Sequence, residues 1–250
     1  MSTGGPSLRT LSVVVPAHDE ARLIGRCLDA VALAAARTPV RVEVVVVANR
    51  CRDATAAVAA DAGATVVESG ARNLAVVRNL GIEASAGDVV VTVDADCRLH
   101  PDSLRLALGL LASGRFVGGG TRVVPERRST GIDATYALVG AMTFVTGLSG
   151  GSFWSTRSDL DAVGGFDTSV LVAEDLDLAR RLRTHGRRTG RRWGTIRTAP
   201  VEASCRKFDR YGDWHMFAMG RELRSIAAAR RGTDTSWVDR YFFDFQDVVD

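Results

Sequence analysis

The sequence predicts an α/β fold in which a mostly parallel central sheet is flanked by helices. Three valine-rich runs, residues 11–15, 42–47 and 89–93, are apolar at both odd and even positions, as strands covered by helices on both faces are. Segments with helical spacing of apolar residues separate these runs, and such alternation is typical of a parallel sheet. With 250 residues, the chain is long enough to bury a sizeable core.

The first half of the chain has helix signals between its strands. Asp53 is a typical helix-capping residue, Gly63 is a typical residue at a helix end, and Pro101 suits a first helical turn. We therefore expect helices over residues 21–37, 53–62, 74–86 and 101–112, and a short additional strand over residues 65–68.

The second half has a less regular pattern. Leu178 and Leu182 have the i, i+4 spacing of a helix face, and we expect Gly186 to end that helix. The remaining elements are expected as one or two strands over residues 116–124 with a glycine hinge at 118–120, helices over residues 132–147 and 157–163, and a helical tail over residues 211–250.

Charge and composition narrow the class of protein. The formal net charge of +3 is small for this length, which argues against a dedicated nucleic-acid-binding protein. Of the 32 lysine and arginine residues, only Lys207 is lysine, and we attribute most of this bias to GC-rich coding. The run from Arg180 to Arg197 contains eight arginines. It is either a solvated face or a surface for an anionic acceptor or anionic lipid headgroups.

Cysteine usage and hydropathy bear on the location of the protein. The four cysteines form no CxxC pair and no zinc-ligand spacing, so we expect reduced thiols. Residues 1–10 are polar and do not resemble a signal peptide, and the apolar segment 136–148 is too short to span a membrane. We expect a cytoplasmic protein without a transmembrane segment, and peripheral contact with a membrane stays open.

Two acidic pairs are candidates for chemistry. Asp94 and Asp96 directly follow the third valine-rich strand, and side chains two apart in an extended chain point to the same side. At the carboxyl end of a strand they could hold Mg²⁺ or Mn²⁺ against a diphosphate, although one Asp could instead cap a turn. Glu174 and Asp175 open a helix, where acids are also common because of the helix dipole.

The chain resembles the family 2 glycosyltransferases of the GT-A fold over roughly residues 10–210. The resemblance rests on six pieces that occur in the family's order. They are 12–20 (SVVVPAHDE), 45–55 (VVVANRCRDAT), 78–81 (RNLG), 87–96 (GDVVVTVDAD), 150–167, which begins GGSFW and ends GGFD, and 174–177 (EDLD).

The resemblance implies a nucleotide-diphosphate sugar as donor. Asn49 stands where the family more often has Asp, and its carbonyl keeps an acceptor for the N3–H of uracil. A UDP-sugar is therefore favoured and a GDP-sugar is allowed. By position in the family pattern, the residues expected to bind the nucleotide sugar are Pro16, His18, Glu20, Asn49, Arg78, Asp94, Ala95, Gly151 and Arg206.

The same resemblance implies a metal site and a catalytic base. Asp96, with Asp94, matches the family's DXD motif for Mn²⁺ or Mg²⁺, and His215 is a candidate third ligand. Asp175 matches the general base that deprotonates the acceptor hydroxyl, in a single displacement that inverts the anomeric carbon. Glu174 is expected to raise a carboxyl pKa through like charge.

The implied organisation is a single GT-A catalytic domain with a helical extension. Residues 1–120 form the nucleotide-sugar-binding half, residues 121–210 the acceptor half, and residues 211–250 the extension. Trp154 is either a platform for a sugar or a core residue. The acceptor, whether a small molecule, a glycan or a lipid-linked sugar, is not readable from the sequence, and a homodimer is compatible with it.

Two other functions compete with sugar transfer. A sugar-phosphate nucleotidyltransferase would normally have a glycine-rich, basic phosphate loop after the first strand, and residues 16–20 contain neither glycine nor lysine. A catalytically inactive nucleotide-sugar-binding module is the other alternative. The presence of all four acids, Asp94, Asp96, Glu174 and Asp175, speaks against it.

Overall fold

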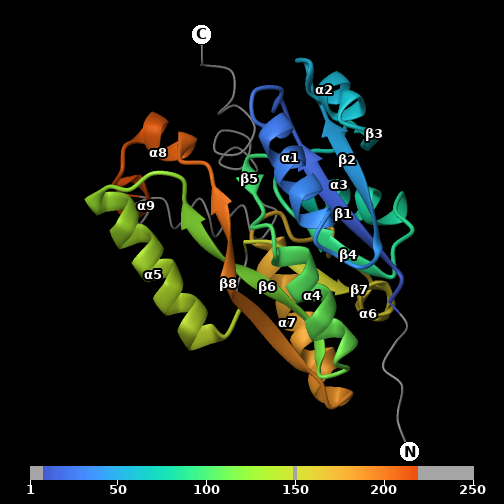
Figure 1. Cartoon of the computed structure of the whole chain (residues 1–250). Helices are drawn as coiled ribbons and strands as arrows, with labels where there is room; N and C mark the ends of the chain where they lie inside the picture. The colour runs from blue at the N-terminus through green and yellow to red at the C-terminus, as the bar shows by residue number, and fades with distance from the viewer. Residues whose placement is uncertain (1–7, 149–150, 219–250) are drawn as a thin grey trace, which may run out of the picture.

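A computed structural model describes residues 8–148 and 151–218, and within these residues the chain forms one eight-stranded sheet flanked by helices (Figure 1). The order of the strands is β3-β2-β1-β4-β7-β6-β8-β5. Their bounds are β1 Thr10–Ala17, β2 Arg41–Asn49, β3 Thr65–Ser69, β4 Val89–Thr92, β5 Cys97–Arg98, β6 Phe116–Pro125, β7 Phe153–Thr156 and β8 Arg192–Ala203.

The first four strands form a parallel half-sheet. β1 pairs in parallel with both β2 and β4, and β2 pairs in parallel with β3. These are the three valine-rich runs and the short additional strand, so the predicted parallel sheet is confirmed. Because the strands run in one direction, their carboxyl ends meet at one edge, where open α/β sheets bind ligands.

The helices cover both faces of the sheet. Their bounds are α1 Ile24–Ala35, α2 Thr55–Asp61, α3 Leu74–Glu83, α4 Ser103–Ala112, α5 Thr130–Thr146, α6 Arg157–Val163, α7 Glu174–Arg188, α8 Arg206–Tyr211 and α9 His215–Ala218. One apolar cluster joins β1 and β4 to α1 and α4, and a second joins them to α3, α6 and α7. The predicted two-sided covering of the sheet is therefore present.

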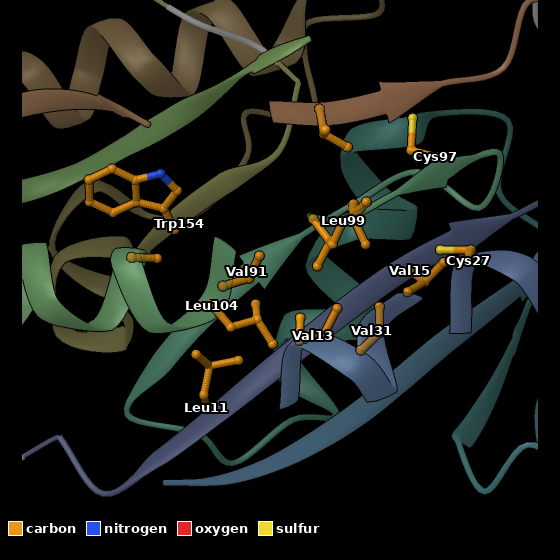
Figure 2. Close-up of a cluster of buried hydrophobic side chains, with 14 of the residues drawn as sticks. Leu11, Val13, Val15, Cys27, Val31, Val91, Cys97, Leu99, Leu104 and Trp154 are labelled. Carbon is orange, nitrogen blue, oxygen red and sulfur yellow. The ribbon is translucent and has the colours of Figure 1, made fainter. Parts of the chain in front are cut away.

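Strand β1 shows how the two layers arise from the sequence. Leu11, Val13 and Val15 point into the cluster beneath α1 and α4 (Figure 2), whereas Val14 belongs to the cluster on the other face. Successive strand residues alternate between faces. An apolar run of this kind is therefore buried twice, once against each helical layer.

The sequence patterns miss two strands of the second half. β7 pairs antiparallel with both β4 and β6, and the long strand β8 pairs in parallel with β6. The expected hinge at residues 118–120 is wrong, because Gly118, Gly119 and Gly120 pair continuously with β7 and β8. Trp154 of β7 is 1 % exposed, and its Nε1 donates to the Gly120 carbonyl at 3.3 Å, so it is a core residue.

The structure changes the predicted end of α7 and describes only the first part of the predicted helical tail. α7 does not end at Gly186 but continues to Arg188, because Gly186 is buried against Val117 of β6 and serves close packing. Of the predicted helical tail, residues 211–218 contribute the end of α8 and α9, and residues 219–250 lie outside the described part. Within the described residues, no helix combines the length and the apolar character needed to cross a bilayer.

Replacing Gly81 by Ala should destabilise the fold, whereas the same change at Gly109 should not. A Cβ at Gly81 of α3 would lie 2.3 Å from Val14 Cγ1 of β1, so α3 would have to move off the sheet. A Cβ at Gly109 of α4 meets nothing within 4 Å.

We expect Gly81→Ala to lower the free energy of unfolding by about 1–3 kcal/mol. Gly109→Ala should raise it by about 0.5–1 kcal/mol through helix propensity. Chemical denaturation of both variants measures this difference, and equal effects of the two changes would contradict the close packing of α3.

Candidate active site

A cleft of about 370 Å³ opens at the carboxyl ends of the parallel strands. It receives residues from the ends of β1, β2 and β4, from α3, from the start of α7 and from α8. Eleven of the residues predicted for the site line this cleft: Pro16, His18, Glu20, Asn49, Arg78, Asp94, Ala95, Asp96, Glu174, Asp175 and Arg206.

Arg78 is at the centre of the cleft's charge arrangement. Its guanidinium donates to Glu174 Oε1 through Nη1, and to Asp94 Oδ1 through Nη2 at 2.9 Å. It also lies over the ring of Phe166, 5.4 Å from the centroid. Burial alone would lower the pKa of Arg78, but Asp94 and Glu174 outweigh it and raise the pKa, so the side chain is a permanent cation.

The two acids of α7 are held at the floor of the cleft. Ala173 precedes them with φ 61°, a left-handed conformation that is costly for a residue with a Cβ. It turns the chain so that Glu174 and Asp175 both enter the cleft. Burial raises the pKa of both carboxyl groups, and Arg78 opposes this rise in each. Burial, rather than the neighbouring like charge, is therefore the main cause of the raised pKa values.

A second arginine bridges the opposite wall of the cleft. Arg206, at the start of α8, binds both carboxylate oxygens of Glu20, with Nη1 2.8 Å from Oε2. Its Nη2 is also 3.2 Å from Asp96 Oδ2. Residues 186 positions apart in the chain thus close one side of the site.

The donor set of the cleft fits a hard divalent cation. The Asp94 side chain is 51 % exposed and the Asp96 side chain is 22 % exposed, so both carboxylates are open to the cleft. Magnesium is commonly bound through one or two carboxylates, with phosphates and water completing its shell. Among the described residues, the one set of three ligand-type side chains within 4.8 Å is Asp19, Cys51 and Asp53, and backbone N–H groups already donate to both of its acids.

The end of the cleft beside β2 has the features of a base-binding site. Asn49 is 3 % exposed and lines the cleft, and its Oδ1 accepts no hydrogen bond in the described part of the chain. A buried acceptor without a partner is costly unless a ligand supplies a donor. The Nδ1 of His18 lies 2.7 Å from the backbone carbonyl oxygen of Asn49, and this contact fixes the imidazole beside the cleft.

Two predicted residues do not line the cleft. Gly151 is packed against Val123 of β6 and Val201 of β8, and its role in binding the donor stays a prediction. His215 is packed edge-on against Phe208, with ring centroids 4.7 Å apart, and its Nδ1 is 2.9 Å from the Gly212 carbonyl. Burial lowers the pKa of His215. The described structure therefore does not bring it to Asp94 and Asp96, and its role as a metal ligand stays a prediction.

Residues that the sequence patterns did not single out also line the cleft. Arg72 lies just before α3 and Lys207 follows Arg206, so each adds positive charge to a site rich in acids. Burial lowers the pKa of Lys207. The position of Lys207 as the single lysine of the chain, beside a predicted arginine, is the one sequence feature that could have indicated it.

The molecule is an α/β protein with acids at the carboxyl ends of its parallel strands, and sequence comparison names the family. The model of Glycosyl transferase family 2 matches residues 12–138, and that of Glycosyl transferase family group 2 matches residues 89–211. The chain belongs to glycosyl transferase family 2. A comparison with curated proteins found no match.

Solved structures share the fold at low identity. TarS of S. aureus aligns with a TM-score of 0.60 at 15 % identity, over 84 % of this chain and 39 % of its own. The mannosyltransferase PcManGT of Pyrobaculum calidifontis, in complex with GDP-Man and Mn²⁺, gives 0.59 at 23 %, over 80 % and 58 %. Glucosyl-3-phosphoglycerate synthase of Mycobacterium tuberculosis, with Mn²⁺ and UDP, gives 0.59 at 21 %, over 91 % and 82 %. This chain therefore spans less than two thirds of the length of the TarS and PcManGT chains.

Removing Arg78 should destabilise the protein strongly, and more at high pH than at low pH. In Arg78→Met, Glu174 is left buried without its cation, which typically costs about 3–5 kcal/mol. The folded-state pKa of Glu174, already raised by burial, rises further without Arg78. Stability that depends on a protonated Glu174 is present at low pH and lost as the pH rises through that pKa.

We therefore expect the loss for Arg78→Met in urea unfolding to be smaller at about pH 5 than at about pH 8. Arg37→Met is the matched control, because Arg37 is an exposed arginine 3.5 Å from Asp102. Its loss should stay below about 1 kcal/mol at both pH values. A loss for Arg78→Met as small as that of Arg37→Met would show that the buried pair does not organise the site.

Proposed function

We propose that the protein is a metal-dependent, inverting glycosyltransferase that moves a sugar from a nucleotide-diphosphate sugar to an acceptor hydroxyl. The observation that carries this proposal is the single cleft in which Asp94, Asp96 and Asp175 meet two arginines, Arg78 and Arg206. The cleft contains hard oxygen ligands for a metal, two guanidinium groups that can bind a diphosphate, and one carboxylate, that of Asp175, whose pKa is raised. Family membership supports transfer of a glycosyl group as the reaction class.

The nucleotide base is assigned to the end of the cleft beside β2. The unpartnered Oδ1 of Asn49 would accept the N3–H of a uracil, which supports a UDP-sugar. A guanine also has ring N–H donors, so a GDP-sugar remains the second choice. Pro16 and His18 would contact the base and ribose, since both line the cleft together with Asn49.

The reaction is a single displacement at the anomeric carbon. Asp175 accepts the proton of the acceptor hydroxyl, whose oxygen forms the new bond to carbon as the bond to the diphosphate oxygen breaks. The electron pair of that bond leaves with the diphosphate. Arg78 holds Glu174 and Asp94 by direct hydrogen bonds, and it thereby positions the start of α7 against the DXD turn.

Asp94 and Asp96 would hold the divalent cation, Mn²⁺ or Mg²⁺. When bound, the cation supplies positive charge that stabilises the departing diphosphate. Arg206 already pairs with Asp96 at 3.2 Å, so its guanidinium would be positioned to contact the diphosphate held by the cation. Structures of two fold neighbours contain Mn²⁺, which supports the choice of metal.

The proposed division of the chain follows from which segments line the cleft. Residues 1–120 supply the strand ends that would bind the nucleotide sugar, and residues 121–210 supply α7 and Arg206. We therefore assign acceptor binding to the second half, and residues 211–250 to an extension of the catalytic domain. The chemical identity of the acceptor is a question for the transfer assay.

A donor panel tests the function directly. The protein is incubated with UDP- and GDP-sugars in the presence of Mn²⁺ or EDTA, and release of nucleoside diphosphate is followed. We expect release from a UDP-sugar that EDTA abolishes. Pyrophosphate release from a nucleoside triphosphate and a sugar phosphate would point to a nucleotidyltransferase, and saturable donor binding without any turnover would point to an inactive module.

Asp175→Asn should reduce turnover by about 10²–10⁴-fold while leaving donor affinity unchanged, because the amide cannot accept the acceptor's proton. Asp177→Asn is the matched control, since Asp177 lies on the same helix but pairs with Arg181 at 2.6 Å, away from the cleft. Calorimetric titration of the nucleotide measures binding separately. Near wild-type transfer by Asp175→Asn would overturn the assignment of the base.

The pH profile provides a further prediction. Burial raises the pKa of Asp175 above the ordinary value of an aspartate, and the base acts only when it is deprotonated. We therefore expect kcat/KM to fall on the acidic side with an apparent pKa above the ordinary value of an aspartate. Nucleotide affinity over the same pH range is the control. If kcat/KM instead fell with an apparent pKa at or below that of an ordinary aspartate, the assignment of Asp175 as the base would be contradicted.

A further inference from the structure

Exposed apolar side chains are concentrated on one side of the molecule. Of the eleven large apolar side chains that are exposed in the described part of the chain, nine lie on α5 or at residues 211–217. We call this the α5 surface, and it consists of Leu138, Val139, Met142, Phe144, Val145, Tyr211, Trp214, Met216 and Phe217. Single exposed apolar residues are ordinary, but a gathered set marks an interaction site.

The two parts of the α5 surface are joined by packing. Tyr136 of α5 contacts Phe208 of α8, with ring centroids 6.3 Å apart, and a Cβ at Gly131 would lie 2.6 Å from the Asp213 carbonyl oxygen. Figure 1 shows α8 and α9 at the N-terminal end of α5, on the same side of the molecule. The exposed apolar side chains of α5 and of residues 211–217 therefore belong to elements that pack directly against each other.

The outward stripe of α5 has helical spacing. Leu138, Met142 and Val145 follow at i, i+4 and i+7, so they share one face of the helix. Val145 is 82 % exposed and its neighbour Phe144 is 76 % exposed. Such exposure carries a hydration cost that burial in an apolar phase removes. The aromatic group at residues 211–217 includes Tyr and Trp, which favour the boundary between an apolar phase and water.

Arginines lie beside the α5 surface. A hollow of about 530 Å³ separates α5 from β6 and β8, and Arg122, Arg128 and Arg197 line it together with Phe144. Arg122 and Arg197 each follow one of the paired residues Thr121 and Ile196, at the point where the register between β6 and β8 shifts. Arg128 pairs with Asp133, which also lines the hollow, whereas Arg122 and Arg197 are exposed and form no ion pair with another described residue. Neighbouring like charges of this kind favour an anion.

We propose that the α5 surface binds the face of an anionic phospholipid bilayer. Its exposed apolar side chains would enter the interfacial region, and Arg122 and Arg197 would meet the lipid phosphates. A bilayer supplies both the apolar phase and the anionic groups, and arginine stems suit that boundary because they bury carbon while the guanidinium stays at the phosphates. A second copy of the chain would instead bring the same arginines to one shared interface, which is electrostatically unfavourable.

Vesicle co-sedimentation of the full chain tests this proposal. The vesicles are phosphatidylcholine alone, or phosphatidylcholine with about 30 % phosphatidylglycerol. We expect the protein to bind the anionic vesicles at least about tenfold more strongly than the neutral ones, and to be released as the salt concentration rises. Equal or absent binding to both kinds of vesicle would overturn the proposal.

Paired variants separate the α5 surface from general effects of charge or hydrophobicity. Val145→Glu and Arg122→Glu should each weaken binding to anionic vesicles by about tenfold. Leu33→Glu and Arg41→Glu are the controls, because both residues are exposed and lie on α1 and β2, and they should bind like the wild type. Circular dichroism checks that each variant folds, and Met142→Gln replaces Val145→Glu if that variant does not.

Two results would contradict the proposal even if the wild type binds vesicles. Unchanged binding by both Val145→Glu and Arg122→Glu would show that another surface is used. A dimer in sedimentation velocity that Val145→Glu converts to a monomer, with no change in vesicle binding, would show that the α5 surface is an interface between copies of the chain.

Discussion

The arrangement of the cleft depends on one buried cation. Arg78 is carried by α3, and its guanidinium binds the first acid of α7 and the first acid of the DXD turn. Three separate segments of the chain are therefore held at fixed separations by one planar group with several donors. Such a buried network contributes little net stability, because desolvation offsets the attraction. Its effect is to fix geometry, and the chain tolerates it because every charge has a partner.

A second arginine repeats this arrangement on the other wall. Arg206 joins Glu20 of the first strand's loop to Asp96, as Arg78 joins Glu174 to Asp94. Each acid of the DXD turn thus faces its own guanidinium. A nucleotide diphosphate with a divalent cation would bring both negative and positive charge into this array, so the same arginines could contact phosphate while the acids contact metal. The cleft is consequently organised for a ligand of mixed charge.

The parallel half of the fold was predictable because its strands are buried on both faces and therefore read as continuous apolar runs. β7 and β8 were not predicted. β7 has only four residues, and β8 begins with arginine and contains polar residues throughout, so neither reads as a continuous apolar run. Gly186 suggested a helix end but is a packing residue inside α7. Glycine at such a position has two physical uses, and sequence alone does not separate them.

The candidate site was predictable where chemistry follows local geometry. Asp94 and Asp96 were placed by their two-residue spacing at a strand end, and Glu174 and Asp175 by their position at a helix start. The contacts among these residues were not predictable, because Arg206 and Glu20 are joined only by the folding of the whole chain. Gly151 and His215 were assigned from the family pattern; neither lines the cleft in the described structure, and their proposed roles stay predictions.

The most direct test of the central claim is calorimetric titration of the wild-type protein with UDP, with GDP and with uridine, each with and without Mn²⁺. We expect UDP to bind best and its affinity to fall at least about tenfold without the metal or in Asp96→Asn. We expect uridine to bind weakly and independently of the metal. UDP binding that is absent, or equally strong without metal and in Asp96→Asn, would contradict a metal-assisted diphosphate site in this cleft.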